Sequence, residues 1–214
     1  KVGDLIKLVH SELNMQFELD ENQAVVWVIE SPKIFRRFGQ ELMAQADGHE
    51  GRFILSDNDK QLDIKQNMEV ILTPYAIDLN DKKCLNKIYA ELKVLAYNEQ
   101  YYTATQTVLN QIHHYLITLE QDTCIDLSFA EPDLIQLWKA SGVKADDTEC
   151  DLLPIIVQYL KIAVRLLDKK VLVFVNLSFY LEESEIEELL QEAFYLKVSL
   201  ILIEQRELSF STGV

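Results

Sequence analysis

The chain has 214 residues, and its 20 Lys or Arg against 35 Asp or Glu give a formal net charge of −15 at pH 7. Apolar residues make up 49% of it, which is enough for a hydrophobic core and excludes an intrinsically disordered protein. No apolar run approaches the ~18 residues that a membrane-spanning helix needs, and no secretory signal is recognisable. Because the chain has only three Cys, widely spaced, a disulfide framework is excluded and a cytoplasmic location is expected. Its acidity argues against nucleic acids as partners.

The first part of the chain has the pattern of an α/β unit. Residues 24–30 form a continuous β-branched and aromatic run, which predicts a strand buried on both faces. A serine and a proline follow it, as at the start of many helices, so a helix is predicted over residues 32–46. Two short strands are expected next, at residues 52–55 and 69–72. This order of elements favours an α/β fold.

The middle of the chain changes character. From residue 80 to 119 there is no Pro or Gly, and apolar residues recur at helical spacing, which predicts one helix of roughly 40 residues, about 60 Å long. Such a helix is far longer than the usual ~11–12 residues and indicates an extended arm. Shorter helices are expected at residues 133–141 and 152–167.

The α/β pattern then resumes. Residues 170–176 and 198–203 predict two further apolar strands, with an acidic-faced helix over 182–196 between them. The sequence therefore predicts an α/β head made from both ends of the chain, residues 1–78 and 169–214. An all-helical insertion, residues 79–168, interrupts this head.

Three apolar strands that lead into helices raise the question of nucleotide binding. The turn after the first strand, residues 30–33, has no glycine to let a backbone approach a phosphate, and Pro32 removes an amide from it. Asn176 ends the second apolar strand, where a magnesium-binding strand carries a carboxylate. Signatures of serine hydrolases, zinc proteases and CxxC proteins are missing as well. The sequence predicts an ATPase-like sheet without catalysis.

Two groups of charged residues remain as candidate sites. Five carboxylates follow the long helix: Glu120, Asp122, Asp126, Glu131 and Asp133. Ca²⁺ takes about 6–8 oxygen ligands and tolerates irregular geometry, so a calcium site is one interpretation of them and a solvated acidic surface is the other. The second group consists of lysines that occur in twos along the sequence. Each of them alone is typical of a solvated surface. Lys82 and Lys83 at a helix start oppose the helix dipole, which would fit a nearby anion.

Several segments, taken in order along the chain, resemble one known family. They are Val28-Ile-Glu-Ser-Pro-Lys-Ile-Phe35, Leu137-Trp-Lys-Ala-Ser-Gly-Val143, Lys169-Lys-Val-Leu-Val-Phe-Val-Asn176, Tyr180-Leu-Glu-Glu-Ser-Glu-Ile186 and Leu202-Ile-Glu-Gln-Arg206. These segments are similar to the Csn-type accessory adaptation protein of subtype II-A CRISPR–Cas systems.

The resemblance implies a degenerate ATPase-like α/β head with a helical leg, and no catalytic activity. It further implies a homotetrameric ring stabilised by Ca²⁺ that binds the ends of linear double-stranded DNA, without sequence preference, during spacer acquisition. Its calcium ligands correspond to Asp122, Asp126 and Glu131, with Glu120 as a possible substitute. Further implied partners are the CRISPR integrase complex and the effector nuclease. The alternative is a catalytically inactive, nucleotide-binding-like scaffold that recruits protein partners through its acidic helices.

The net charge constrains how such a ring binds DNA. A tetramer of strongly acidic chains repels DNA at long range unless its cations are gathered on one surface. A closed ring can gather lysines on its inner wall, where they displace counterions from phosphates and position DNA without specifying its sequence. The expected DNA-binding residues are Lys60, Lys65, Lys82, Lys83, Lys139 and Lys144.

Overall fold

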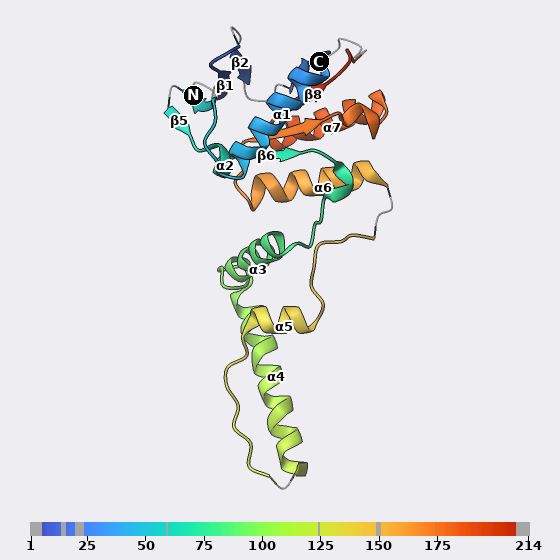
Figure 1. Ribbon diagram of the computed structural model, residues 1–214. Helices are drawn as coiled ribbons and strands as arrows, with labels where there is room; N and C mark the ends of the chain where they lie inside the picture. Colours follow the sequence, from blue (N-terminus) through green and yellow to red (C-terminus); the bar gives the residue numbers. More distant parts are fainter. Residues whose placement is uncertain are drawn as a thin grey trace. The chain divides into compact units, whose positions relative to one another are not determined.

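The computed structural model describes residues 6–13, 16–19, 24–58, 60–123, 125–148 and 151–208. It divides into two compact units (Figure 1). The first unit comes from both ends of the chain, up to Leu79 and from Asp147, and the second comprises Asn80–Asp146. The predicted α/β class, a head made from both ends of the chain and interrupted by a helical insertion, is confirmed.

The first unit contains a parallel sheet of four strands in the order β3-β8-β7-β6. These strands are β3 (Ala24–Val28), β6 (Met68–Ile71), β7 (Val171–Val175) and β8 (Ser199–Glu204). Both β7 and β8 are buried along their whole length, as their unbroken apolar runs predict. β3 lies at the end of the sheet order and is less buried than predicted: only Trp27 is fully buried, whereas the partly buried Val25 and Val26 pack against the cores on the two faces.

A second, antiparallel sheet was not predicted. It has the order β2-β1-β4-β5 and consists of β1 (Ile6–His10), β2 (Gln16–Leu19), β4 (Phe53–Asp57) and β5 (Lys60–Leu62). Burial alternates along β1, so that one face of this sheet turns toward a core. Leu8 and Leu55, which pair across β1 and β4, both belong to that core.

The two faces of the parallel sheet carry different layers. Val173 and Ile201 pack in one core with the antiparallel sheet and with α1 (Pro32–Ala46). Leu172 and Leu200, one position earlier on each strand, pack in the other core. That second core is closed by α6 (Leu152–Arg165) and α7 (Glu183–Leu196). The smaller elements of this unit are α2 (Ile64–Asn67), η1 (Pro74–Ala76) and η2 (Leu177–Phe179).

The extent of the insertion differs from the one expected. The sequence placed it at 79–168 and included the helix over 152–167. In the structure this helix, α6, packs on the parallel sheet through side chains such as Ile156 and Leu160, which are fully buried. The compact helical unit therefore ends at Asp146.

The second unit consists of α3 (Lys82–Ala96), α4 (Tyr102–Thr123) and α5 (Leu134–Ala140). The predicted single helix over 80–119 is wrong, because the chain breaks between α3 and α4. Asn98 makes the break: its side chain accepts a hydrogen bond from the Tyr101 amide at 2.9 Å, and its carbonyl accepts one from Tyr102 at 2.9 Å. Within the described ranges, no helix combines the length and the apolar character that crossing a bilayer requires.

Candidate nucleic-acid interface

The six predicted DNA-binding lysines are divided between the two units. Lys60 begins β5 and Lys65 lies in α2, and both are exposed on the first unit. The other four belong to the second unit: Lys82, Lys83, Lys139 and Lys144.

The fold of the second unit brings its lysines together at one end. The Asn80 side chain donates to the Ala145 carbonyl at 3.1 Å and accepts from the Ala145 amide at 2.8 Å. This pair of hydrogen bonds joins the start of the unit to its end. It places Lys144, next to Ala145, near the first turn of α3, which carries Lys82 and Lys83.

Tyr89 of α3 links α5 to the same end. Its hydroxyl donates to the Val143 carbonyl at 2.8 Å, and its ring lies 5.7 Å from Nζ of Lys139. The Tyr89 side chain is buried, whereas Lys139 is exposed. A cation over an aromatic face at this distance is attracted to the ring, so Tyr89 restrains the direction of the Lys139 side chain.

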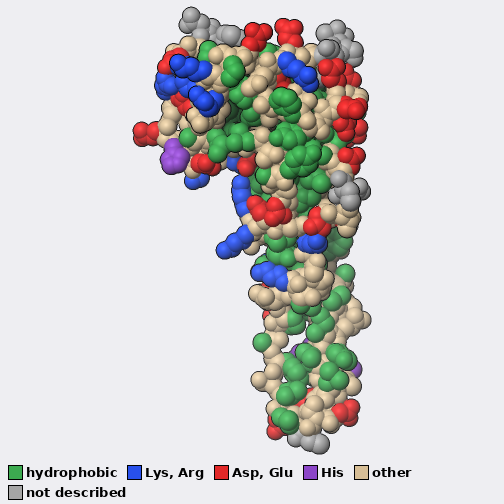
Figure 2. Space-filling model, turned by 45° about the vertical axis from the view of Figure 1, so that its right-hand side comes forward, with side chains coloured by type: hydrophobic (Ala, Val, Ile, Leu, Met, Phe, Trp, Pro, Cys, Tyr) green, Lys and Arg blue, Asp and Glu red, His purple; other side chains and the backbone are tan. Residues whose placement is uncertain are grey.

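The basic residues of the second unit are segregated along its sequence. Residues 80–146 contain six Lys, no Arg and nine Asp or Glu, and no Lys or Arg occurs between residues 94 and 138. All six lysines thus lie on α3, on α5 and in the segment after α5. On the face drawn in Figure 2, Lys side chains project near the end where the chain enters and leaves this unit, and the tip displays apolar and acidic side chains.

The predicted calcium ligands lie near the far end of α4. Glu120 and Asp122 belong to its last turn, and Asp126 and Glu131 follow in the segment that returns toward α5. Oε1 of Glu120 accepts a hydrogen bond from the Leu127 amide at 2.7 Å, which ties this turn together. Over the described residues, which exclude Cys124, no three His, Cys, Asp or Glu side chains are grouped so as to hold a metal ion. The predicted ligands are therefore not gathered into a group of three carboxylates within the described part of one chain.

The carboxyl edge of the parallel sheet was the other candidate site. The Ile29 amide, at the start of the turn after β3, donates to the Glu204 carbonyl at 2.8 Å and is not available to a phosphate. Pro32 has no amide to offer. Asn176 adopts a left-handed conformation with φ 53°, and its buried Oδ1 has no hydrogen-bond partner among the described residues. Two positions of this turn therefore offer no amide to a nucleotide phosphate.

Sequence reasoning missed a buried carboxylate at this edge. Glu204 is fully buried and accepts hydrogen bonds from the Ser178 hydroxyl at 2.7 Å and the Ser178 amide at 3.2 Å. The only signal for Glu204 in the sequence is that an acidic residue ends the apolar run of β8. A cavity of about 600 Å³ lies beside Ser178, lined by the chain from there to Ser184 and by Arg206 and Leu208.

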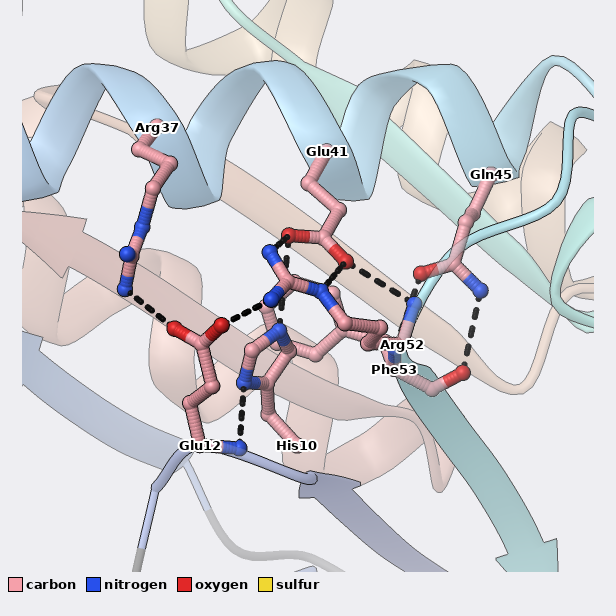
Figure 3. A network of polar contacts seen from close by, with 7 residues as sticks. All are labelled: His10, Glu12, Arg37, Glu41, Gln45, Arg52 and Phe53. Carbon is pink, nitrogen blue, oxygen red and sulfur yellow. Dashed lines mark hydrogen bonds and ion pairs between the residues drawn. The ribbon is translucent and has the colours of Figure 1, made fainter.

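A larger polar network joins the antiparallel sheet to α1 (Figure 3). Arg52 donates to both carboxylate oxygens of Glu41, at 3.0 and 2.9 Å, and also pairs with Glu12. Arg37 lies 2.8 Å from the other Glu12 oxygen. The buried His10 accepts from the Glu12 amide at 3.2 Å, and its Nε2 lies 3.4 Å from Glu41. The arginines of this network are thereby occupied by carboxylates and are not free to bind phosphates.

The network also sets the charge state of Glu41. Its hydrogen bond with Arg52 outweighs the opposing effect of burial and lowers the pKa of the carboxyl from 4.5 to about 2. A group whose pKa is lower in the folded than in the unfolded state stabilises the fold above its unfolded pKa. The contribution of Glu41 is therefore complete above about pH 5 and is lost as the pH falls toward 2. This network acts as a structural connection between β1, β4 and α1.

The fold and these surfaces define an α/β protein with a parallel sheet and a lysine-bearing helical insertion. A family model described as CRISPR-associated protein (Cas_Csn2) matches residues 45–213. Since this match spans well over half of the sequence, the chain belongs to the Cas_Csn2 family, and the family predicted from the sequence is confirmed. Membership of this family supports a role in CRISPR adaptation.

The chain is similar to several solved structures. The crystal structure of Stu0660 of Streptococcus thermophilus aligns with a TM-score of 0.56 and 12% identity, over 93% of this chain and 68% of that one. At this identity the likeness shows a shared fold. Another similarity is to cbiO1 from Clostridium perfringens, part of the ABC transporter complex cbiONQ. It has a TM-score of 0.49 and 8% identity, over 95% of this chain and 79% of that one.

Proposed function

We propose that this chain is a non-enzymatic, cytoplasmic protein that binds the ends of linear double-stranded DNA during CRISPR spacer acquisition. It acts as a homotetrameric ring stabilised by Ca²⁺ and does not read the DNA sequence. The observation that carries this proposal is the segregation of all six lysines of residues 80–146 to one end of the helical unit. The CRISPR integrase complex and the effector nuclease are the protein partners that we propose for this ring.

An acidic chain can bind DNA only if its positively charged side chains are gathered on one surface. Lysines that neutralise phosphates release condensed counterions, which provides affinity that does not depend on sequence. Such contacts need a surface where lysines outnumber carboxylates locally, whatever the net charge of the whole chain. The lysine-bearing end of the helical unit meets this requirement, and Lys60 and Lys65 are the proposed contribution of the first unit.

The exposed apolar surface of the helical unit supports an oligomer. Only Leu109 of the 22 residues of α4 is buried. Large apolar side chains on α4 and on the returning segment are 38–65% exposed: Val108, Tyr115, Ile117, Leu119, Ile125 and Leu127. A monomer rarely leaves an extended apolar surface in water, and a second copy of the chain offers the same surface to cover it.

Charge reversal should abolish DNA binding. Changing Lys60, Lys65, Lys82, Lys83, Lys139 and Lys144 to Glu is expected to weaken binding of linear duplex at least about 100-fold at 0.1 M salt. It should also reduce the slope of log K against log salt by up to about 5, since each phosphate contact contributes about 0.9. Gel shifts over a salt series would measure both, with covalently closed circles as a DNA form that has no end to bind.

The control for the six-lysine variant reverses the charge of four exposed cations of the first unit: Lys33, Arg36, Lys161 and Arg165. This variant should keep the affinity and salt slope of the unmodified chain. An unchanged slope in the six-lysine variant would contradict the assignment of these residues. If neither form of DNA is bound by the unmodified chain, the inactive scaffold that recruits protein partners becomes the better proposal.

The oligomer and the calcium dependence are tested together. Light scattering should give four times the chain mass of 24.8 kDa with Ca²⁺ and a smaller mass after chelation. Because no three such side chains are grouped in the described part of one chain, we propose that backbone carbonyls or a neighbouring chain supply further ligands. Changing Asp122, Asp126 and Glu131 to their amides should remove the response to Ca²⁺. A mass of 24.8 kDa under both conditions would exclude the ring.

A further inference from the structure

The lysines of α3 occupy one face of the helix. At about 100° per residue, Lys82, Lys83, Lys87 and Lys93 fall within an arc of about 140°. The other residues in this arc are Asn86, Ala90 and Val94, so it contains no carboxylate. All seven side chains are exposed, and Glu91 lies outside the arc. The opposite side of α3 carries the partly or fully buried residues Cys84, Leu85, Ile88 and Leu92.

Much of the positive charge on this face is not neutralised by carboxylates of the described part of the chain. No ion pair joins Lys82, Lys87 or Lys93 to a described acidic residue, in contrast to the paired Arg37, Arg52 and Lys170 of the first unit. Asp81 precedes the face, but its carboxylate caps α3 by accepting from the Cys84 amide at 2.6 Å.

Tyr89 connects this face to α5. It lies about 20° from Lys82 and about 40° from Lys93 around the helix, between them along the axis. Lys139 reaches over its ring from α5. Lys139 is thereby placed beside the row that runs from Lys82 to Lys93.

The length of the row identifies the chemistry of its ligand. Lys82 and Lys93 are 11 residues apart, which corresponds to about 16 Å along α3. Duplex DNA carries one charge per about 1.7 Å of its axis, so this distance faces roughly ten phosphate charges. A single nucleotide cannot engage both ends of the row, whereas the backbone of a duplex can.

We propose that this face of α3, including Lys87 and Lys93, is the main phosphate-binding surface of the chain, and that Tyr89 is a positioning residue that aims Lys139 along it. This inference rests on the proposed DNA binding and deepens it. It adds two lysines that sequence reasoning did not single out and one buried aromatic residue that does not itself touch DNA.

The first test removes the two added lysines. In fluorescence anisotropy with a linear duplex over a salt series, changing both Lys87 and Lys93 to Ala should lower the salt slope by about 1.8. At 0.1 M salt the affinity should fall by a factor of tens. The control changes Lys161 and Arg165, two exposed cations four residues apart on α6, to Ala and should change neither value. If the slope of the double variant stays unchanged while the unmodified chain binds DNA, the assignment of phosphate binding to this face of α3 is wrong, but the proposed function still stands. If the unmodified chain does not bind linear duplex, both fail.

The second test separates positioning from folding. Changing Tyr89 to Leu should lower the salt slope by the same increment as changing Lys139 to Ala, about 0.9, and should add nothing when Lys139 is already Ala. Changing Tyr89 to Phe keeps the ring and should keep the slope, although the hydrogen bond to Val143 is lost. Additive losses from Tyr89→Leu and Lys139→Ala, or an unchanged slope in Tyr89→Leu, would overturn the positioning role.

Discussion

Replacing Lys169 with Met should lower the free energy of unfolding by about 3 kcal/mol. Lys169 is only 7% exposed, and its Nζ donates to the carbonyls of Lys65 and Met68 at 2.7 and 2.8 Å. Glu69 lies 3.3 Å from the same nitrogen. Methionine fills a similar volume but leaves two carbonyls and a carboxylate without this donor. The loss is large because these groups cannot all recover their hydrogen bonds from water.

The neighbouring residue provides the control for this prediction. Lys170 pairs with Asp57 at 2.6 Å, but its side chain is 38% exposed, so changing it to Met should cost less than about 1 kcal/mol. Urea unfolding would measure both variants in a Trp138→Phe background, in which Trp27 alone reports on the first unit. Equal losses from the two variants would show that the buried hydrogen bonds of Lys169 contribute nothing.

Two glycines should respond to the same substitution with opposite signs. A Cβ added at Gly51 would lie 2.4 Å from the side-chain amide of Gln45. Gln45 cannot move aside freely, because it is buried and bonds both the amide and the carbonyl of Phe53, at 2.9 and 3.0 Å (Figure 3). Changing Gly51 to Ala should therefore cost about 2 kcal/mol of unfolding free energy.

Gly39 is the matched position. It lies inside α1, and a Cβ there would meet nothing within 4 Å. Changing Gly39 to Ala should stabilise the chain by about 0.5–1 kcal/mol, because alanine loses less backbone freedom in a helix. The same urea experiment applies to both variants. Destabilisation at Gly39, or a neutral result at Gly51, would contradict the packing described around α1.

The strands that were predicted well are those with unbroken apolar runs. Residues 171–175 and 199–204 are buried on both faces, so their sequence carries the signal by itself. Of the antiparallel sheet, only the strand expected at residues 52–55, which is β4, was predicted. The others were missed because they are short and one-sided; β1 alternates Ile6, Leu8 and His10 with more exposed residues. Pairing between β1 and β4 decides that structure, and a single segment does not reveal its partner.

Two other differences have local causes. The break between α3 and α4 uses neither Pro nor Gly, and Asn98, whose side chain caps the new helix, was its only signal. Helix α6 was assigned to the insertion because it follows helices in the sequence, whereas its buried Ile156 and Leu160 pack on the parallel sheet. Periodicity predicts a helix but not the surface that the helix covers.

The candidate site was predictable only in part. Lys82 and Lys83 stood out as a dipeptide, whereas Lys87 and Lys93 gain meaning only when the helix places them on one face. Tyr89 carries no signal in the sequence that distinguishes it from any other aromatic residue of an amphipathic helix. Its effect depends on Val143 and Lys139, which lie about fifty residues further along the chain.

The paired hydrogen bonds between Asn80 and Ala145 have an evolutionary consequence. They fasten together two points 65 positions apart, so that both ends of the helical unit lie side by side. For a flexible inserted segment, each doubling of its length adds only about 0.6 kcal/mol to the entropic cost of closing the loop. Because its two ends are joined in this way, the helical unit can become longer or shorter at its tip with little effect on the stability of the α/β unit. Its length is therefore free to change under selection.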